Sequence, residues 1–431
     1  MMYTALKKIE THTAKIGIIG VGYIGLPMAI EMAKHNDVIA FDTDFDKIQM
    51  LRLGKSYIDD IRDCDVELFI KNKRIQPTTD EGELDCVDCY IVCVPTPLNV
   101  NKQPDLKYII SAANIIANHL KKGNVVIFES TTYPGTTNEL IRPILEKAGL
   151  ICDKDFFLAF SPERVDPGNV QFKTSNTAKV VGGTSKEASE IVSKLYEVNL
   201  NCEIFKVSSP TVAEMSKILE NTYRNINIGL IDEFAIICNK MGIDIWEVID
   251  AAKTKPFGFQ AFYPGPGVGG HCIPLDPLYL SWKVKEYGIS TTMIEASGRV
   301  IDNMPNYVVE RISKILNDYQ KPVNGARILI VGVAYKANIS DCRESPAINV
   351  IKELKTRKAY VDIYDPYVNS INIDGEQYTT IDSLVNENYD LIVLLVNHSG
   401  VDNKKLIEFG VPIFDTRNAL KEYSCSHIIK L

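Results

Sequence analysis

Short β-branched runs alternate with helix-length amphipathic segments in two parts of this 431-residue chain, and a helical stretch separates them. The first part covers residues 15 to about 206, and the second begins at Arg327. Buried apolar runs separated by helices are typical of a parallel sheet with helices on both faces. The expected strands are Lys15–Ile19, Val38–Phe41, Tyr90–Val94, Val125–Glu129, Phe157–Phe160, Lys179–Val181, Glu203–Val207, Ile328–Val331, Val361–Tyr364, Leu391–Val396 and Ile413–Phe414.

The stretch between the two parts predicts a long helix. Pro210 suits its first turn, and the helical pattern extends to about Lys240, long enough to join two domains. The two halves also echo each other, since Val38–Asp42 resembles Val361–Asp365. The predicted fold class is therefore α/β, with two Rossmann-like doubly wound domains joined by a central α-helical domain that contains the long connecting helix. The boundaries that we expect are 1–207, 208–317 and 318–431.

The composition argues against several classes of protein. A net charge of −8 disfavours nucleic acid as a partner, because neutralising phosphates requires a basic surface. No run approaches the ~20 apolar residues that span a bilayer, and residues 1–15 lack a signal-peptide core, so we expect a cytoplasmic protein without a membrane partner. The cysteines are too scattered for a disulfide framework, and Cys86 with Cys89 lacks a second pair, so no metal site is expected.

A glycine-rich turn with the pattern G-x-G-x-x-G follows the first expected strand and precedes a helix-length segment. In a dinucleotide site the first glycine makes the tight turn, the second lets a pyrophosphate approach, and the third allows close helix packing. Asp42 ends the next strand, where a carboxylate binds ribose hydroxyls and repels a 2′-phosphate, so NAD is expected rather than NADP. The corresponding turn of the second half begins at Gly332 but lacks the second and third glycines of the pattern. This predicts a different phosphate ligand there. The predicted cofactor-binding turn is Gly20, Val21, Gly22, Tyr23, Ile24 and Gly25.

Glycines and prolines crowd the positions before Cys272, which predicts a shaped loop over Tyr263–Pro277. His271 and Asp276 accompany the cysteine in this segment. A thiolate can add to an aldehyde formed by hydride removal, and the adduct can lose a second hydride to give a thioester that water hydrolyses. Beside a dinucleotide fold, this chemistry favours Cys272 as a covalent nucleophile. The alternative is a tight connection with an incidental cysteine.

Taken together, these segments resemble the UDP-glucose/UDP-N-acetylhexosamine 6-dehydrogenase family over nearly the whole chain. The motifs occur in the family's order, which is far more specific than any one of them. They are Gly20–Gly25, Val94–Pro97, Glu129–Pro134, Ser161–Glu163, Lys217–Asn221, Gly269–Cys272 with Asp276, and Gly332–Lys336 with Arg343–Ser345. The resemblance implies an NAD-binding domain over 1–207, a central helical dimerisation domain over 208–317 and a C-terminal UDP-sugar-binding domain over 318–431.

The resemblance also implies catalytic roles. Cys272 matches the thiol nucleophile, and Lys217 with Asn221 match a pair that stabilises an oxyanion; their i, i+4 spacing places both on one helix face. Without the family match, Lys217 would be interpreted as a solvated helix position. Further matches, to residues that hold a catalytic water or do acid–base work, are Asp276, Thr131 and Glu163.

Other matches imply ligand contacts. To the NAD site the resemblance adds Lys47, Thr96, Thr131 and Arg343. To the UDP-sugar site it assigns Glu163, Arg164, Val165, Lys217, Asn221, Arg224, Phe262, Tyr263, Gly269, Tyr335, Lys336 and Arg417. Each has a plainer alternative; Arg343, for example, could form a surface ion pair with Glu344.

The segments on both sides of Cys272 look like the UDP-N-acetylglucosamine branch of the family. The resemblance therefore implies NAD-dependent four-electron oxidation of the C6 alcohol of UDP-N-acetylglucosamine to the carboxylate, for surface polysaccharide precursors, by a homodimer or larger homo-oligomer. UDP-N-acetylmannosamine, UDP-N-acetylgalactosamine and UDP-glucose stay open as substrates. A two-electron hydroxyacid dehydrogenase would need neither Cys272 nor residues 327–431, and a non-catalytic UDP-sugar sensor would not need Cys272 or Lys217.

Overall fold

The computed structural model describes residues 1–58, 61–166, 168–169, 171–270 and 272–431, and for Cys272 the backbone alone. The chain divides into two compact units, one of Met1–Glu220 with Leu278–Ile289 and the other of Asn221–Pro277 with Ser290–Leu431. The expected central domain is thus shared between the units, and the three domain boundaries stay a prediction.

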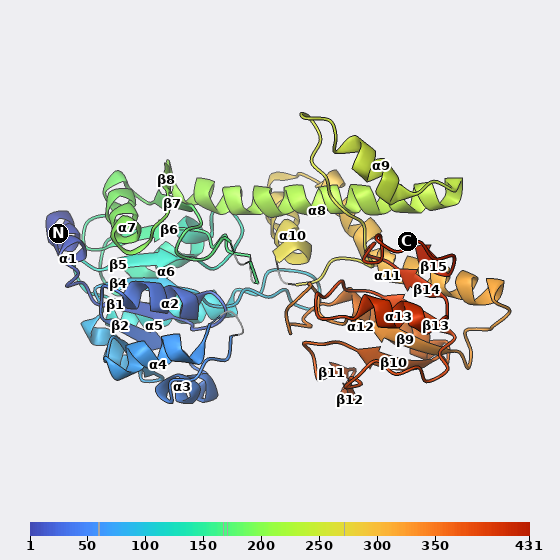
Figure 1. Ribbon diagram of the computed structural model, residues 1–431. Coiled ribbons are helices and arrows are strands. Elements are labelled where there is room, and N and C mark those ends of the chain that lie inside the picture. The colour runs from blue at the N-terminus through green and yellow to red at the C-terminus, as the bar shows by residue number, and fades with distance from the viewer. Residues whose placement is uncertain (59–60, 167, 170, 271) are drawn as a thin grey trace. The chain divides into compact units, whose positions relative to one another are not determined.

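The first unit contains a sheet of the strands β1 (Ile16–Ile19), β2 (Val38–Phe41), β3 (Ile75–Thr78), β4 (Cys89–Val92), β5 (Val125–Phe128), β6 (Phe157–Phe160), β7 (Lys179–Gly183) and β8 (Ile204–Val207). Their order is β3-β2-β1-β4-β5-β6-β7-β8, and the first six follow the order of a dinucleotide-binding Rossmann fold (Figure 1). The doubly wound α/β class is therefore confirmed. The prediction of a parallel sheet is wrong for one pair of strands, because β6 and β7 pair antiparallel.

Helices cover both faces of this sheet. Successive residues of a strand point to opposite faces. Ile18 therefore packs in a core with α2 (Gly25–Ala33) and α7 (Lys186–Asn199), and Ile19 packs in another core with α5 (Lys107–His119) and α6 (Arg142–Glu146). Burial on both faces explains why these strands are continuous apolar runs. The helical segments that lie wholly in this unit are α1 (Met2–Glu10), α2 (Gly25–Ala33), α3 (Phe45–Arg52), α4 (Asp63–Lys71), η1 (Glu81–Cys86), α5 (Lys107–His119), η2 (Thr137–Ile141), α6 (Arg142–Glu146), α7 (Lys186–Asn199) and η3 (Val284–Tyr287).

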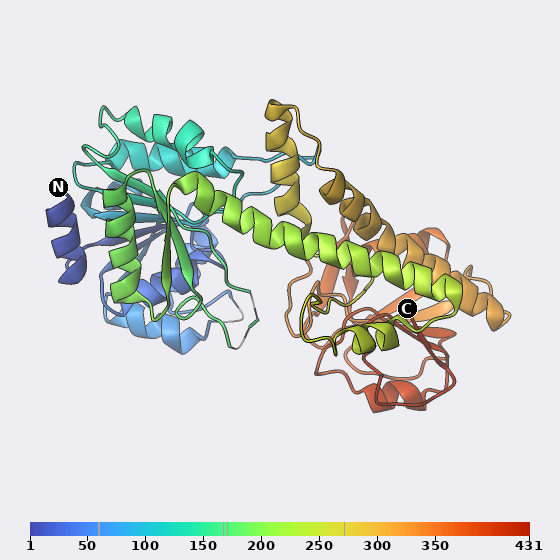
Figure 2. The ribbon, with the colours of Figure 1, turned by 90° about the horizontal axis from the view of Figure 1, so that it is seen from above.

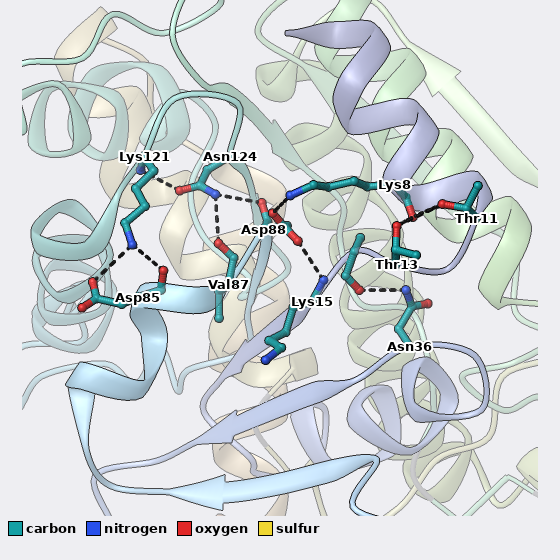
Figure 3. Close-up of polar contacts among 11 residues, drawn as sticks. Lys8, Thr11, Thr13, Lys15, Asn36, Asp85, Val87, Asp88, Lys121 and Asn124 are labelled. Carbon is teal, nitrogen blue, oxygen red and sulfur yellow. Dashed lines mark hydrogen bonds and ion pairs between the residues drawn. The ribbon is translucent and has the colours of Figure 1, made fainter.

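Polar side chains fasten the amino ends of β1, β4 and β5 to one another and to α1 (Figure 3). Asp88 accepts hydrogen bonds from the ammonium of Lys8 at 2.6 Å and from the N–H of Lys15 at 3.0 Å. Asn124 donates to the carbonyl oxygens of Val87 at 2.9 Å and Asp88 at 3.2 Å. Nucleotides bind at the opposite, carboxyl ends of strands in sheets of this kind, so we interpret this edge as structural.

The second unit contains a smaller sheet of β9 (Arg327–Val331), β10 (Tyr360–Tyr364), β13 (Leu391–Leu394), β14 (Ile413–Asp415) and β15 (Ile428–Lys430), with a hairpin of β11 (Ser370–Ile373) and β12 (Glu376–Thr379). The parallel order β10-β9-β13-β14-β15 is that of a flavodoxin-like doubly wound sheet. One face packs against α11 (Thr292–Asp318) and α12 (Pro346–Thr356), and the other against α13 (Asn403–Glu408). The second Rossmann-like half is therefore confirmed.

The long connecting helix is confirmed as α8 (Pro210–Met241), and α9 (Ile245–Ala252) and α10 (Cys272–Lys283) follow it. In the second unit α8 lies against α11, where a Cβ on Gly229 would stand 2.3 Å from Ser297 Oγ (Figure 2). The hydroxyl of Ser297 donates to the carbonyl oxygen of Asn225 at 2.9 Å. Glycine and serine therefore allow the two helices to approach closely.

All strands expected from the sequence are present, with ends that differ by at most two residues. β3, β11, β12 and β15 were not expected. Pro77 and Gln76 break the apolar run in β3, and such a strand is tolerated because it lies at the sheet edge. None of the helices in the described part of the chain is long and apolar enough to cross a membrane.

Candidate functional site

The glycine-rich turn after β1 has the geometry of a phosphate cradle. Gly20 has a φ of +89°, which favours glycine. A Cβ on Gly25, the first residue of α2, would lie 1.8 Å from the carbonyl oxygen of Gly20, so helix and strand are in close contact. A Cβ on Gly22 would meet no described atom within 4 Å, which leaves its backbone open to a ligand. The three glycines therefore fit the roles that a dinucleotide pyrophosphate requires.

Asp42 is fixed beside this turn, directly after β2. Its Oδ2 accepts the N–H of Val21 at 3.0 Å, and its Oδ1 accepts the N–H of Asp44 at 2.9 Å. Lys47 Nζ lies 4.0 Å from Asp42 Oδ2 and 3.5 Å from Asp44 Oδ2. Tyr23, within the turn, is exposed. The carboxylate is thus held where a ribose bound at this turn would lie.

Two threonines expected to contact the cofactor follow the neighbouring strands. Thr96 comes after β4, and its carbonyl oxygen accepts a hydrogen bond from the hydroxyl of Tyr279. Thr131 comes after β5 and is partly buried, next to Ser130, whose hydroxyl donates to the carbonyl oxygen of Val94 at 2.8 Å. Both threonines therefore lie at the carboxyl ends of strands, the edge that also carries the glycine turn.

Glu163 and Lys217 meet in the interior of the first unit. Lys217 Nζ donates to the carbonyl oxygen of Glu163 at 2.5 Å, and both residues are buried. Glu163 Oε1 accepts the N–H groups of Arg164 at 2.8 Å and Val165 at 2.6 Å. Its Oε2 is buried and accepts no hydrogen bond from the described residues. Lys217 is therefore not a solvated helix position, and Glu163 has one oxygen, 3.5 Å from Lys179 Nζ, that accepts no hydrogen bond from the described residues.

Arg164 is fixed by two contacts of its guanidinium group. Nη2 pairs with Glu220 Oε1 at 2.9 Å, and Nη1 donates to the carbonyl oxygen of Ala178 at 2.9 Å. The chain on the C-terminal side of Glu163 is therefore anchored to α8 and to the residue before β7.

Asn221 and Asp276 form a direct hydrogen bond in the second unit. Asn221 Nδ2 donates to Asp276 Oδ2 at 2.5 Å, and both side chains are buried. One turn further along α8, Asn225 Nδ2 donates to the carbonyl oxygen of Ile273 at 3.1 Å. α8 thus holds the first turn of α10, which begins at Cys272. The side chain of Cys272 and the whole of His271 lie outside the described residues.

Helix α10 corrects the loop predicted over Tyr263–Pro277. The segment is irregular as far as Gly270, but a helix runs from Cys272 to Lys283. Pro274 lies in the first turn, where a backbone N–H has no partner within the helix, so it does not prevent helix formation. Pro277 lies inside the helix and has no N–H for the carbonyl oxygen of Ile273, which accepts a hydrogen bond from Asn225 Nδ2 instead.

The glycine-rich segment before α10 packs on the turn after β9. A Cβ on Gly269 would lie 2.6 Å from Tyr335 Cβ, so glycine is needed for this approach. The N–H of Gly270 donates to the carbonyl oxygen of Arg343 at 3.2 Å, and the guanidinium of Arg343 pairs with Asp341 at 2.5 Å. Lys336 follows Tyr335 and is partly buried. The structure therefore brings Gly269, Tyr335 and the backbone of Arg343 together.

Arg417 and Asp232 both reach Gly265. A Cβ on Gly265 would lie 2.2 Å from Arg417 Nη1, and the N–H of Gly265 donates to Asp232 Oδ1 at 3.0 Å. Asp232 is fully buried, and this burial raises its pKa to about 7, although the Gly265 N–H and the charge of Arg417 oppose the shift. No signal in the sequence distinguishes Asp232, because a carboxylate in a long helix becomes notable only when a loop buries it.

The aromatic residues expected to contact substrate lie beside α8 and α9. The ring of Phe262 meets that of Tyr223 edge-on at 5.9 Å, and the ring of Tyr263 stacks on Trp246 at 6.2 Å. Arg224 is exposed on α8, and no hydrogen bond or ion pair in the described part of the chain joins it to the other expected residues. No group of His, Cys, Asp and Glu side chains suited to a metal ion occurs among the described residues.

All three domains of one family match the chain. The NAD-binding domain of the UDP-glucose/GDP-mannose dehydrogenase family matches residues 14–199, its central domain residues 211–303, and its UDP-binding domain residues 329–422. The matches leave out residues 1–13, which include α1, and residues 200–210, 304–328 and 423–431.

The sequence similarity to several relatives extends over nearly the whole chain. A UDP-N-acetyl-D-glucosamine 6-dehydrogenase from Pseudomonas aeruginosa is 39% identical, over 95% of this chain and 97% of its own. A UDP-N-acetyl-D-mannosamine dehydrogenase from Methanococcus maripaludis is 35% identical, over 94% of this chain and 93% of its own. The solved structure of a UDP-D-ManNAc dehydrogenase from Pyrococcus horikoshii is 32% identical, with a TM-score of 0.87, and the match covers 96% of this chain and 98% of that one.

Proposed function

The chain belongs to the UDP-glucose/GDP-mannose dehydrogenase family, and on that premise we propose that it oxidises the C6 alcohol of UDP-N-acetylglucosamine to the carboxylate through a thioester on Cys272. The observation that carries the proposal is the start of α10 at Cys272, with Asp276 one turn later and hydrogen-bonded to Asn221. This arrangement supports a nucleophile at the start of α10, with a carboxylate on the next turn and an amide of α8 hydrogen-bonded to that carboxylate.

The proposed reaction removes four electrons from one sugar. NAD held by the glycine turn and Asp42 would supply the hydride acceptor for each oxidation, so two NAD would be reduced per sugar. The first oxidation makes a C6 aldehyde. The sulfur of Cys272 then adds to the aldehyde carbon, the adduct loses the second hydride to become a thioester, and water releases the acid and the free thiol.

The position of Cys272 supports this role. The backbone starts α10 at this residue, and helix N-termini carry a partial positive charge that favours a thiolate over a thiol. Because the thiolate is the nucleophilic form, a cysteine at this place suits attack on an aldehyde.

Five further side chains support the chemistry. Lys217 and Asn221 lie one turn apart on α8, are buried, and carry N–H donors of the kind that stabilise an oxyanion. We propose that Glu163 accepts a proton through Oε2, the oxygen that accepts no hydrogen bond from the described residues, and that Asp276 with Thr131 holds the water that hydrolyses the thioester.

The binding residues divide between the two ligands. For NAD we propose the glycine turn, with Asp42 and Lys47 at the ribose and Thr96, Thr131 and Arg343 as further contacts. The contact of Gly265 with Arg417 and of Gly269 with Tyr335 supports a UDP site in the second unit. The proposed UDP-sugar contacts are Glu163, Arg164, Val165, Lys217, Asn221, Arg224, Phe262, Tyr263, Gly269, Tyr335, Lys336 and Arg417.

An apolar stripe along α8 supports a homodimer as the working form. Its side chains recur every three, four or seven residues, and each is more than a third exposed. A helix face of this kind is suited to burial against a second copy of the chain. The stripe consists of Val212, Met215, Leu219, Tyr223, Leu230, Phe234, Ile237 and Met241.

UDP-N-acetylmannosamine is the second candidate substrate, because a relative and a solved structure with similar coverage are dehydrogenases of that sugar. Incubating the protein and NAD with UDP-N-acetylglucosamine, UDP-N-acetylmannosamine, UDP-N-acetylgalactosamine and UDP-glucose separates the candidates. We expect the highest kcat/KM with the first and two NADH for each sugar consumed. One NADH per sugar would refute the thioester route, and a preference for another sugar would refute the choice of substrate.

A further inference from the structure

Lys179, the first residue of β7, places an ammonium group in the interior of the first unit. Its side chain is 4% exposed, and its Nζ lies 2.8 Å from Glu129 Oε2 and 3.5 Å from Glu163 Oε2. Glu129, directly after β5, is fully buried, and its Oε1 accepts a hydrogen bond from the hydroxyl of Tyr196 on α7. One buried cation therefore serves two buried carboxylates, neither of which would be tolerated as a charge without it.

The two carboxylates respond differently to this environment. Burial raises the pKa of Glu129, and the Lys179 ammonium opposes that shift without cancelling it. Burial also acts to raise the pKa of Glu163, but the Lys179 ammonium, the Val165 N–H and other donors outweigh it, so this pKa is lowered. The pKa of Lys179 is raised, because the two carboxylates outweigh its burial. Glu163 is thus the ionised member of the pair, and Glu129 the one that holds a proton more firmly.

Other titratable groups around Glu129 and Glu163 add little negative charge. Burial raises the pKa of the Cys93 thiol after β4 and of the Tyr196 hydroxyl, so both stay neutral. The Lys217 ammonium on α8 adds to the positive field at Glu163. The charge of Glu163 is therefore set mainly by Lys179.

We propose that Lys179 is a positioning residue for the oxidation, which keeps the Glu163 carboxylate charged and its Oε2 available, while Glu129 and Tyr196 hold Lys179 in place. The inference rests on the proposed role of Glu163. A purely structural ion pair would need Lys179 and Glu129 alone. The ammonium instead also faces the oxygen of Glu163 that accepts no hydrogen bond from the described residues, which gives it a direct effect on proton transfer.

Three variants test the inference: Lys179→Met, Lys179→Arg and Glu129→Gln. Two quantities are measured for each, the pKa on the acid side of the kcat/KM profile and the pKa of the Glu163 carboxyl by infrared titration. The infrared band is assigned by its loss in Glu163→Gln. Because an opposite charge at this distance lowers a carboxyl pKa by about 1–3 units, Lys179→Met should raise both values by that amount.

The other variants are matched controls. Lys179→Arg keeps the cation and should keep both pKa values near those of the wild type. Glu129→Gln should also leave the pKa of Glu163 nearly unchanged, because Glu129 still carries its proton in the pH range where Glu163 titrates. If the substitutions only damaged the core in a general way, kcat/KM would instead fall to a similar extent in Lys179→Met and Glu129→Gln.

Unshifted values in Lys179→Met, or equal shifts in Lys179→Met and Glu129→Gln, would overturn the inference. If Lys179→Met does not fold, the double variant Lys179→Met with Glu129→Gln removes the second buried carboxylate and should show the same raised pKa of Glu163. The infrared titration needs no turnover. A protein that oxidises no UDP-sugar but shows the expected shift would refute the proposed function and still support the control of Glu163 by Lys179.

Discussion

Asp42 and Asp365 occupy equivalent positions in the two α/β halves. Each follows the second strand of its half, and its Oδ2 accepts the N–H of the residue after the turning glycine, from Val21 at 3.0 Å and from Val333 at 2.7 Å. In the second half His398 Nε2 also lies 3.1 Å from Asp365 Oδ2, and neither of these side chains is exposed. Asp42 keeps 13% of its side chain exposed, so it alone of the two is open to a ribose.

This difference predicts the effect of changing Asp42. Asp42→Asn removes the charge that repels a 2′-phosphate while keeping an acceptor for the Val21 N–H. We expect kcat/KM with NADP, relative to NAD, to rise by about tenfold or more, which corresponds to ~1.4 kcal/mol. Cofactor-dependent rates with both nucleotides measure it. Asp365→Asn is the control and should leave the cofactor preference unchanged; an unchanged preference in Asp42→Asn would contradict the assignment.

Cys272→Ser should abolish formation of the acid. An alcohol side chain is a far weaker nucleophile than a thiolate at neutral pH, so no thioester forms, and we expect a loss in kcat of about a thousandfold or more. NAD binding, measured by calorimetry, should be retained. Cys425→Ser, a partly buried cysteine in the same unit, serves as the control and should keep wild-type turnover. Acid production by Cys272→Ser near the wild-type rate would remove the cysteine from the mechanism.

Local sequence signals were sufficient for the elements of the fold. The strand that contains Ile18 and the glycine turn at Gly20 could be predicted because both depend on neighbours within a few residues. The antiparallel pairing of β7 with β6 could not, because the direction of a strand is set by the path of the chain around it. The same holds for the site: Lys217 was found through its motif, whereas Lys179 and Asp232 matter only through groups far away in the sequence.

The buried carboxyl of Asp232 predicts a pH-dependent stability. The pKa of this carboxyl is about 7 in the folded chain, against an ordinary value of 3.8. The difference corresponds to ~4 kcal/mol in the free energy of unfolding. Since the folded pKa is the higher one, the stabilising contribution is fully present below pH 3.8 and is lost as the pH rises to about 7. Asp232→Asn cannot ionise, and it should therefore gain stability over the wild type across this range.

Thermal unfolding of both proteins at about pH 5 and about pH 8 checks this expectation. The unfolding temperature of Asp232→Asn should exceed that of the wild type by more at the higher pH. A difference that is independent of pH would show that the carboxyl does not ionise on this scale. Because asparagine retains an acceptor for the Gly265 N–H, the loop should stay in place in the variant.

Gly265→Ala tests the contact between the glycine-rich segment and Arg417. The added Cβ would stand 2.2 Å from Arg417 Nη1, and the Gly265 backbone cannot retreat without stretching its hydrogen bond to Asp232. The guanidinium must therefore move, and if it binds the diphosphate, the KM for the UDP-sugar should rise by roughly tenfold or more, the worth of one charge-assisted hydrogen bond. The KM for NAD should stay the same. Gly298→Ala in α11 is the matched control, since a Cβ there would meet no described atom within 4 Å; equal KM values in the two variants would show that Arg417 does not contribute to binding.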